Sequence, residues 1–132
     1  MTRPRVLFVC VENSCRSQMA EAFGKMHGGE RVDVFSTGSR PSGRVNETAI
    51  ELMWEVGYDL SKHRSSPPSE LPAGEFDVLV SMGCGDECPT VPAARRIEWE
   101  IPDPKHMPLS DFREVRDHLE SEVVRLLASL EA

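Results

Sequence analysis

Short runs rich in apolar residues mark the strands that the chain is expected to form. Val6–Cys10 is apolar throughout, and Phe76–Val80 is interrupted by a single aspartate. Such runs are typical of strands buried on both faces, as in a parallel sheet. Val32–Ser36 has a similar pattern, and Arg95–Ile101 contains a weaker one. The pattern therefore predicts four strands.

Between these runs, apolar residues recur every three or four positions, which predicts helices. The first helix is expected from Ser17 to Gly28, the second follows Asn46 as N-cap and ends at Gly57, and the third has Ser110 as a candidate N-cap. The residues expected to point inward are Met19, Ala22, Phe23 and Met26, then Ala49, Ile50, Met53 and Trp54, and finally Phe112, Val115, Leu119, Val123, Leu126, Leu127 and Leu130. The Ser- and Pro-rich segment 60–74 is expected to be mainly loop.

Strands that alternate with helices indicate βαβ units and a parallel sheet. The chain of 132 residues has the length of one domain. We therefore predict a single α/β domain over residues 1–132, a three-layer α/β/α fold around a central four-stranded parallel sheet. Ligands of such sheets bind beyond the carboxyl ends of the strands, and Cys10 lies at one such end.

The formal net charge of −7 argues against a nucleic acid as the main partner. It also means that any anion site must be built locally, from main-chain N–H groups and a few guanidinium groups. No stretch approaches the length of a membrane span, and the apolar run near the N-terminus is too short for a signal peptide. We expect a cytoplasmic protein that does not bind membranes.

The segment Cys10–Ser17 carries the strongest chemical signal, a cysteine followed after five residues by arginine and serine. Between a strand and a helix, such a loop can point successive N–H groups inward and form an anion-binding nest at the helix N-terminus. Arg16 would close the ring, Ser17 would hydrogen-bond the sulfur of Cys10, and Asn13 tolerates positive φ. The expected oxyanion-binding residues are Val11, Glu12, Asn13, Ser14, Cys15 and Arg16.

A thiolate is favoured in such a nest and would attack a bound tetrahedral oxyanion. The alternative is a buried strand-end cysteine beside a surface arginine, which the flanking strand and helix disfavour. Glu12 is unusual in this loop because a carboxylate beside an anion site should point to solvent and lower oxyanion affinity. Cys15 is expected to be structural, the alternative being that it traps Cys10 in an off-pathway disulfide under oxidation.

The four cysteines fall into two close pairs, Cys10 with Cys15 and Cys84 with Cys88. In a reducing compartment, such pairs indicate catalytic, redox or metal-binding thiols rather than a structural disulfide framework. The spacing differs from that of a zinc ribbon, and zinc would consume Cys10 as a ligand. Cys84 and Cys88 lie in a glycine-rich, acidic segment that does not resemble a core, which favours redox chemistry.

The segment VLFVCVENSCRSQMAEAF resembles the oxyanion loop and first helix of the thioredoxin-coupled arsenate reductases, which share the fold of the low-molecular-weight protein tyrosine phosphatases. The resemblance extends to FSTGSRP, to Leu60–His63, and to Trp99 and Asp103-Pro104. It implies arsenate reductase activity, with Cys10 attacking arsenate and Asp103 donating a proton. It also implies that Cys84 attacks Cys10, that Cys88 resolves the resulting disulfide, and that thioredoxin restores the thiols.

Cys84 and Cys88 are closer together than in the better-known members of that family, which leaves mycothiol or glutathione open as the reductant. We expect no tightly bound cofactor, a monomer, and phosphate or sulfate as competing oxyanions. The resemblance also implies a weak alkali-cation site at Asn13, Glu21 and Ser36, and no other metal site is expected.

Two other functions remain open. The first is a phosphatase for phosphotyrosine or a small phosphoester, using Cys10, Arg16 and Asp103. The residues after Asp103 include no aromatic side chain, which counts against phosphotyrosine. The second, a non-catalytic oxyanion sensor, would not need both a nucleophile and an acid.

Overall fold

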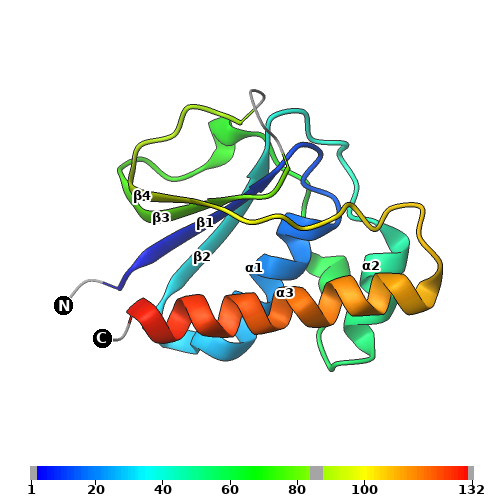
Figure 1. Cartoon of the computed structure of the whole chain (residues 1–132). Helices are drawn as coiled ribbons and strands as arrows, with labels where there is room; N and C mark the ends of the chain where they lie inside the picture. Colours follow the sequence, from blue (N-terminus) through cyan, green and yellow to red (C-terminus); the bar gives the residue numbers. More distant parts are fainter. Residues whose placement is uncertain (1–2, 84–87, 131–132) are drawn as a thin grey trace.

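Four parallel strands form the centre of the computed structural model, which describes residues 3–83 and 88–130 (Figure 1). The strands are β1 (Arg5–Cys10), β2 (Asp33–Gly38), β3 (Phe76–Ser81) and β4 (Ala93–Glu98). The helices are α1 (Arg16–Gly28), α2 (Glu47–Trp54) and α3 (Leu109–Leu130), with short 3-10 helices η1 (Gly29–Arg31), η2 (Leu60–Lys62) and η3 (Pro68–Glu70). The predicted α/β fold with a four-stranded parallel sheet is confirmed.

The strand order β2-β1-β3-β4 places β1 between two parallel neighbours. The register pairs Cys10 with Gly38 of β2 and Val9 with Ser81 of β3. Because all strands run in the same direction, their carboxyl ends meet at one edge of the sheet. The loops that follow these three strands therefore start from neighbouring points.

The larger core lies on the face of the sheet that carries Val6, Phe8 and Cys10 of β1. Side chains from α1, α2 and α3 pack on this face, and the three helices lie on the same side of the sheet (Figure 1). Phe8 and Phe23 are fully buried in it. Each buried aromatic or large aliphatic side chain contributes roughly 2 kcal/mol of hydrophobic stabilisation.

A smaller apolar cluster covers the other face of the sheet. Leu7 and Val9 of β1 pack there with Leu79 of β3, Leu71 and Val91. In the part of the chain that the structure describes, this layer is made by η3 and connecting segments rather than by a long helix. The second layer is therefore thinner than the first.

Two residues predicted to point inward are exposed. Trp54 has an exposed fraction of 58%, and Met26 has one of 37%. The buried stripe of α2 is centred on Ala49, Leu52 and Met53, so the last residue of this helix lies beside the stripe. Met26 is similarly displaced from the buried stripe of α1. The periodic pattern predicted the helices correctly but overestimated the width of their buried faces.

The boundaries of several elements also differ from the prediction, among them the end of α2 at Trp54 instead of Gly57. The fourth strand lies earlier in the chain, at Ala93–Glu98, because Phe76 and its successors on β3 pair with this segment. Helix α3 begins at Leu109, so Ser110 lies within its first turn and is not its N-cap. Asn46 is confirmed as the N-cap of α2, and its side chain accepts a hydrogen bond from Ala49 N.

An ion-pair cluster joins α2 to α3. Glu55 accepts hydrogen bonds from Arg113 (Nε 2.9 Å, Nη2 2.7 Å) and from Arg116 Nη1 at 2.8 Å. Arg116 Nη1 also donates to the carbonyl of Leu52. These hydrogen bonds lower the pKa of Glu55 to about 2, Arg113 having the larger effect.

Among the described residues, none of the helices has the length and hydropathy that a membrane span requires.

Candidate active site

Residues 10–16 form a loop from the carboxyl end of β1 to the start of α1, at the edge of the sheet where the strands end. A small pocket of about 140 Å³ lies inside this loop, and we call it the oxyanion pocket. Its lining comprises Cys10, Val11, Glu12, Ser14, Cys15, Arg16, Asp103 and Lys105. All of these residues except Lys105 were expected at the site from the sequence, whereas Asn13, also expected, is not part of the lining; their roles stay predictions.

The main chain of the loop is held from outside by hydrogen bonds to its carbonyl oxygens. Val11 O accepts from Arg40 N at 2.9 Å, Glu12 O from Ser42 N at 3.0 Å, and Ser14 O from Asn46 N at 3.0 Å. In a planar trans peptide, the following N–H group points opposite to the carbonyl. The N–H groups of residues 12, 13 and 15 therefore point away from these outer segments, which is the arrangement that an anion nest requires.

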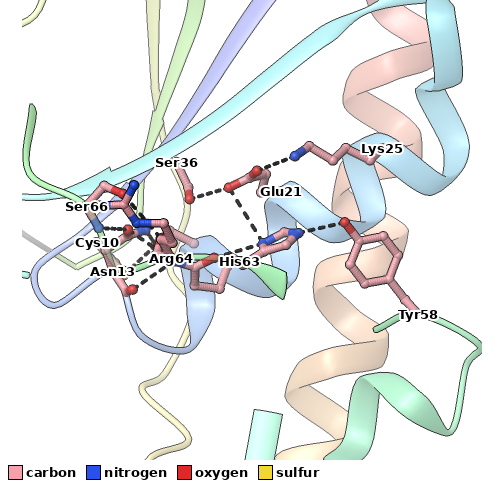
Figure 2. A network of polar contacts seen from close by, with 11 residues as sticks. Cys10, Asn13, Glu21, Lys25, Ser36, Tyr58, His63, Arg64 and Ser66 are labelled. Atoms are coloured by element: carbon pink, nitrogen blue, oxygen red, sulfur yellow. Dashed lines mark hydrogen bonds and ion pairs between the residues drawn. The ribbon is translucent and has the colours of Figure 1, made fainter. Parts of the chain in front are cut away.

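Asn13 fixes the loop through its backbone and its side chain. Its φ of 51° is the only positive φ among the described non-glycine residues, and its side chain is fully buried. Its Nδ2 donates to Ser17 Oγ at 2.8 Å, and its Oδ1 accepts from Ser66 N at 2.8 Å (Figure 2). Since Ser17 Oγ accepts from Asn13, its own hydrogen is available to Cys10 Sγ, 2.9 Å away.

A chain of buried and partly buried polar groups extends from Asn13 through His63 to Tyr58 (Figure 2). Gln18 Nε2 donates to Asn13 O at 3.0 Å and to Arg64 O at 2.9 Å. Its Oε1 lies 2.9 Å from His63 Nδ1, which therefore carries the hydrogen, and Tyr58 OH lies 2.6 Å from His63 Nε2. Burial lowers the pKa of His63, which favours the neutral ring in this chain of hydrogen bonds.

Two glycines allow close packing around the loop. A Cβ atom on Gly38 would lie 2.5 Å from Val11 O and 2.8 Å from Asn13 N. Gly83 has a φ of 77°, and a Cβ atom there would lie 2.6 Å from Arg16 Nη1. Any larger residue at either position would displace the oxyanion loop or the guanidinium group.

Arg16 connects the loop to the segment that contains Asp103. Its Nη1 donates to Ile101 O at 3.0 Å, and its Nη2 lies 3.9 Å from Asp103 Oδ2. The other carboxylate oxygen of Asp103 accepts from Lys105 N at 3.1 Å. Trp99 anchors the start of this segment, because its ring packs on Phe8 with centroids 5.8 Å apart. The carboxylate of Asp103 is thus brought to the rim of the pocket.

Glu12, expected to point to solvent, forms an ion pair at the rim of the pocket. Its Oε1 lies 2.9 Å from Lys105 Nζ, and the two side chains are about half exposed. The hydrogen bond to Glu12 raises the pKa of Lys105. The unfavourable charge of Glu12 beside an anion site is therefore balanced by a lysine that the sequence analysis did not identify.

Cys15 is buried beside Cys10, and both are free thiols. Burial, with a smaller contribution from the negative charge of Asp103, raises the pKa of Cys15 to about 12. Cys15 is therefore a neutral thiol at physiological pH. This agrees with a structural role rather than that of a second nucleophile.

The predicted cation-site residues are engaged in internal contacts. Glu21 Oε1 accepts from Ser36 Oγ at 2.5 Å, and Glu21 Oε2 lies 2.7 Å from Lys25 Nζ (Figure 2). Asn13 Oδ1 is occupied by the hydrogen bond from Ser66 N. An alkali-cation site at these residues stays a prediction. No group of three or more His, Cys, Asp or Glu suited to a metal ion is found within residues 3–83 and 88–130.

The second cysteine pair is only partly described. Cys84 lies outside the described residues. Cys88 is half-buried against the smaller apolar cluster and is disulfide-bonded. The disulfide state of Cys88 is compatible with redox chemistry in this segment.

Sequence reasoning missed Gln18, His63 and Lys105 as site residues. Gln18 offered a signal, because it shares a helix face with Ala22 and is a polar residue at a position expected to be buried. His63 and Lys105 reach the site from distant segments, and no local pattern marks them.

Comparisons with known proteins agree with this geometry. The family model described as low molecular weight phosphotyrosine protein phosphatase matches residues 5–132. The glutaredoxin arsenate reductase of Synechocystis sp. is 41% identical over 129 residues, which cover 96% of this chain and 98% of that protein. A solved structure of an arsenate reductase in the phosphate binding state has a TM-score of 0.84 at 39% identity and covers 96% of this chain and 98% of its own.

A thioredoxin-dependent arsenate reductase of Corynebacterium glutamicum has a TM-score of 0.79 at 28% identity, over 98% of this chain and 62% of that one. The family match spans almost the whole chain, and the resemblance predicted from the sequence is confirmed. The chain therefore belongs to the low molecular weight phosphotyrosine protein phosphatase family.

Proposed function

We propose that the protein is an arsenate reductase in which Cys10 is the nucleophile. The observation that carries this proposal is the position of Cys10 Sγ, which lies 2.9 Å from Ser17 Oγ beneath a pocket lined by the loop, Arg16 and Asp103. A ring of N–H groups with one guanidinium group suits a tetrahedral oxyanion. The curated relative from Synechocystis is an arsenate reductase, which supports this choice of oxyanion.

The first step joins sulfur to arsenic. The Cys10 thiolate attacks arsenate in the oxyanion pocket, a sulfur–arsenic bond forms, and one arsenic–oxygen bond breaks. Asp103 is the proposed donor of the proton with which that oxygen leaves as water. Arsenic remains pentavalent at this stage, because no electrons have been transferred to it.

The second step reduces arsenic. Cys84 attacks Cys10 Sγ, a disulfide forms, and the electron pair of the sulfur–arsenic bond stays on arsenic, which leaves as arsenite. Cys88 then attacks Cys84, releases Cys10 as a thiolate, and leaves a Cys84–Cys88 disulfide. The disulfide-bonded state of Cys88 and the free thiol of Cys10 support this order.

An external thiol reductant must reopen the final disulfide. One relative is described as thioredoxin-dependent and another as a glutaredoxin arsenate reductase, so thioredoxin is the proposed partner and the glutathione-based or mycothiol-based system the alternative. We also propose that the protein is a cytoplasmic monomer for which phosphate and sulfate compete with arsenate. The free thiols Cys10 and Cys15 support a reducing compartment.

The test is arsenate-dependent NADPH oxidation with thioredoxin and thioredoxin reductase, compared with glutaredoxin, glutathione and glutathione reductase, and with mycothiol and its reductase. We expect turnover with thioredoxin and its loss in Cys10→Ser, Cys84→Ser and Cys88→Ser. Cys15→Ser is the matched control, because it removes a buried thiol from the same pocket and should retain turnover. Hydrolysis of p-nitrophenyl phosphate that survives Cys84→Ser, without arsenate reduction, would instead identify a phosphatase that uses Cys10, Arg16 and Asp103.

A further inference from the structure

The oxyanion pocket is bordered by a larger groove on the side of α2. This side groove has a volume of about 500 Å³ and is lined in part by Arg44, Val45 and Ile50. Val45 and Ile50 are partly buried apolar residues packed against the larger core, and Arg44 and Glu47 add opposite charges to a lining that is otherwise polar. A groove with this lining suits an organic group attached to an anion.

Glu12 and Lys105 line both the oxyanion pocket and the side groove, as does Ser14. The ion pair between Glu12 Oε1 and Lys105 Nζ, at 2.9 Å, therefore stands between the two spaces. Ser14 is buried in the loop, so at the rim of the oxyanion pocket the two spaces are separated by the ion pair.

The ion pair adds no net charge, so it does not distinguish between dianions by their charge. It acts by the space that its two side chains occupy. The same segment is also fixed at its other end, because Arg16 Nη1 donates to Ile101 O. Residues 101–105 are thus tied to the oxyanion loop from both ends.

We propose that the Glu12–Lys105 ion pair determines substrate specificity by separating the oxyanion pocket from the side groove. An inorganic tetrahedral oxyanion fits in the oxyanion pocket. The organic group of a phosphate monoester needs the side groove, and the ion pair excludes it. This inference rests on the proposed function for its choice of inorganic substrate. The inference adds that Glu12 and Lys105 exclude phosphate esters, although the chain belongs to a phosphatase family.

The test compares inorganic phosphate with phenyl phosphate in a Cys10→Ser background, where binding is measured by calorimetry without turnover. The double variant Glu12→Ala/Lys105→Ala should shift the ratio of the two dissociation constants toward phenyl phosphate by about fivefold or more, since the phenyl ring gains access to the apolar surface of the side groove once the two side chains are removed. The reversed pair Glu12→Lys/Lys105→Glu should retain the wild-type ratio. The matched control is Glu122→Ala/Arg125→Ala, which removes an exposed ion pair from α3.

A second measurement keeps the test independent of the Cys10→Ser background. With Cys10 present, the double alanine variant should raise kcat/KM for p-nitrophenyl phosphate by a similar factor. An unchanged ratio in the double alanine variant, or a reversed pair that behaves like alanine, would overturn the proposal. Failure of the proposed function is distinguishable, because a wild-type protein that does not reduce arsenate would still bind the two phosphates in a measurable ratio.

Discussion

The sulfur of Cys10 and the hydroxyl of Ser17 lie 2.9 Å apart in a buried site, with the hydroxyl oxygen held by Asn13. The hydroxyl hydrogen of Ser17 is thus available to the sulfur of Cys10, because the hydroxyl oxygen already accepts a hydrogen bond from Asn13. Such a donor stabilises a thiolate more than a thiol. The contact links a helix residue to the nucleophile at the end of the strand.

Ser17→Ala should lower the rate of the Cys10 reaction by about ten- to a hundredfold, because a hydrogen bond to a charged group contributes roughly 1.5–3 kcal/mol. The measurement is the rate of Cys10 alkylation by iodoacetamide at neutral pH, together with arsenate turnover. Ser121→Ala, on the exposed face of α3, is the control. Equal alkylation rates in both variants would show that Ser17 does not stabilise the thiolate.

Gln18→Leu should destabilise the fold and weaken oxyanion binding. The change leaves the carbonyls of Asn13 and Arg64 without their side-chain donor, at about 1–3 kcal/mol for each buried acceptor. Urea unfolding measures the first effect, and calorimetry with phosphate measures the second. Tyr58→Phe removes only the outermost hydrogen bond of this network and should change both quantities much less.

Asp103→Asn should depress turnover by about a hundredfold or more while it leaves phosphate affinity largely unchanged. The amide retains the size of the carboxylate and its contact with Lys105 N, but its N–H groups are too weakly acidic to transfer a proton to the leaving oxygen. Steady-state kinetics and calorimetry on the same preparation separate the two effects. Normal turnover in this variant would remove the assignment of Asp103 as the acid.

Alkaline pH should destabilise the protein through Cys15. Its pKa is about 12 in the folded protein against an ordinary value of 9.0, so the unfolded chain loses this proton first as pH rises. Stability is therefore fully present below pH 9 and is lost between pH 9 and about 12, by up to ~1.4 kcal/mol per unit. Cys15→Ala should show a flatter dependence of the unfolding free energy in this window, measured by urea denaturation.

Acidic pH should act through Glu55 with the opposite sign. Its pKa is about 2 in the folded protein against 4.5 ordinarily, so its contribution is present above pH 4.5 and is lost as pH falls toward 2. Glu55→Gln should lower the melting temperature at neutral pH and flatten its decline on acidification. Glu122→Gln, on the same helix α3 as Arg113 and Arg116 but outside the ion-pair cluster, should retain the wild-type decline.

The parts predicted correctly from the sequence depend on local patterns. The strand Val6–Cys10, the following loop and α1 are contiguous, so the anion nest could be inferred from one short segment. The orientation of Asn13 followed in the same way, from the tolerance of asparagine for positive φ.

The parts that were missed join distant segments. Lys105 reaches Glu12 across 93 positions, and His63 reaches Gln18 across 45. Neither contact has a periodic or compositional signal, because Lys105 follows β4 and His63 follows α2, and each contact depends on how the loop after that element folds back. The exposure of Trp54 was missed for a related reason, since helical spacing gives the direction of a buried face but not its width.

The carbonyls of Val11, Glu12 and Ser14 are held by hydrogen bonds from the segment between Arg40 and Asn46. The oxyanion loop therefore has its binding conformation before any ligand arrives. The main-chain N–H groups are already aligned when an oxyanion enters, so binding costs little conformational entropy of the loop. The rigidity of the loop therefore offsets part of the unfavourable overall field that the net charge of −7 creates for an anion.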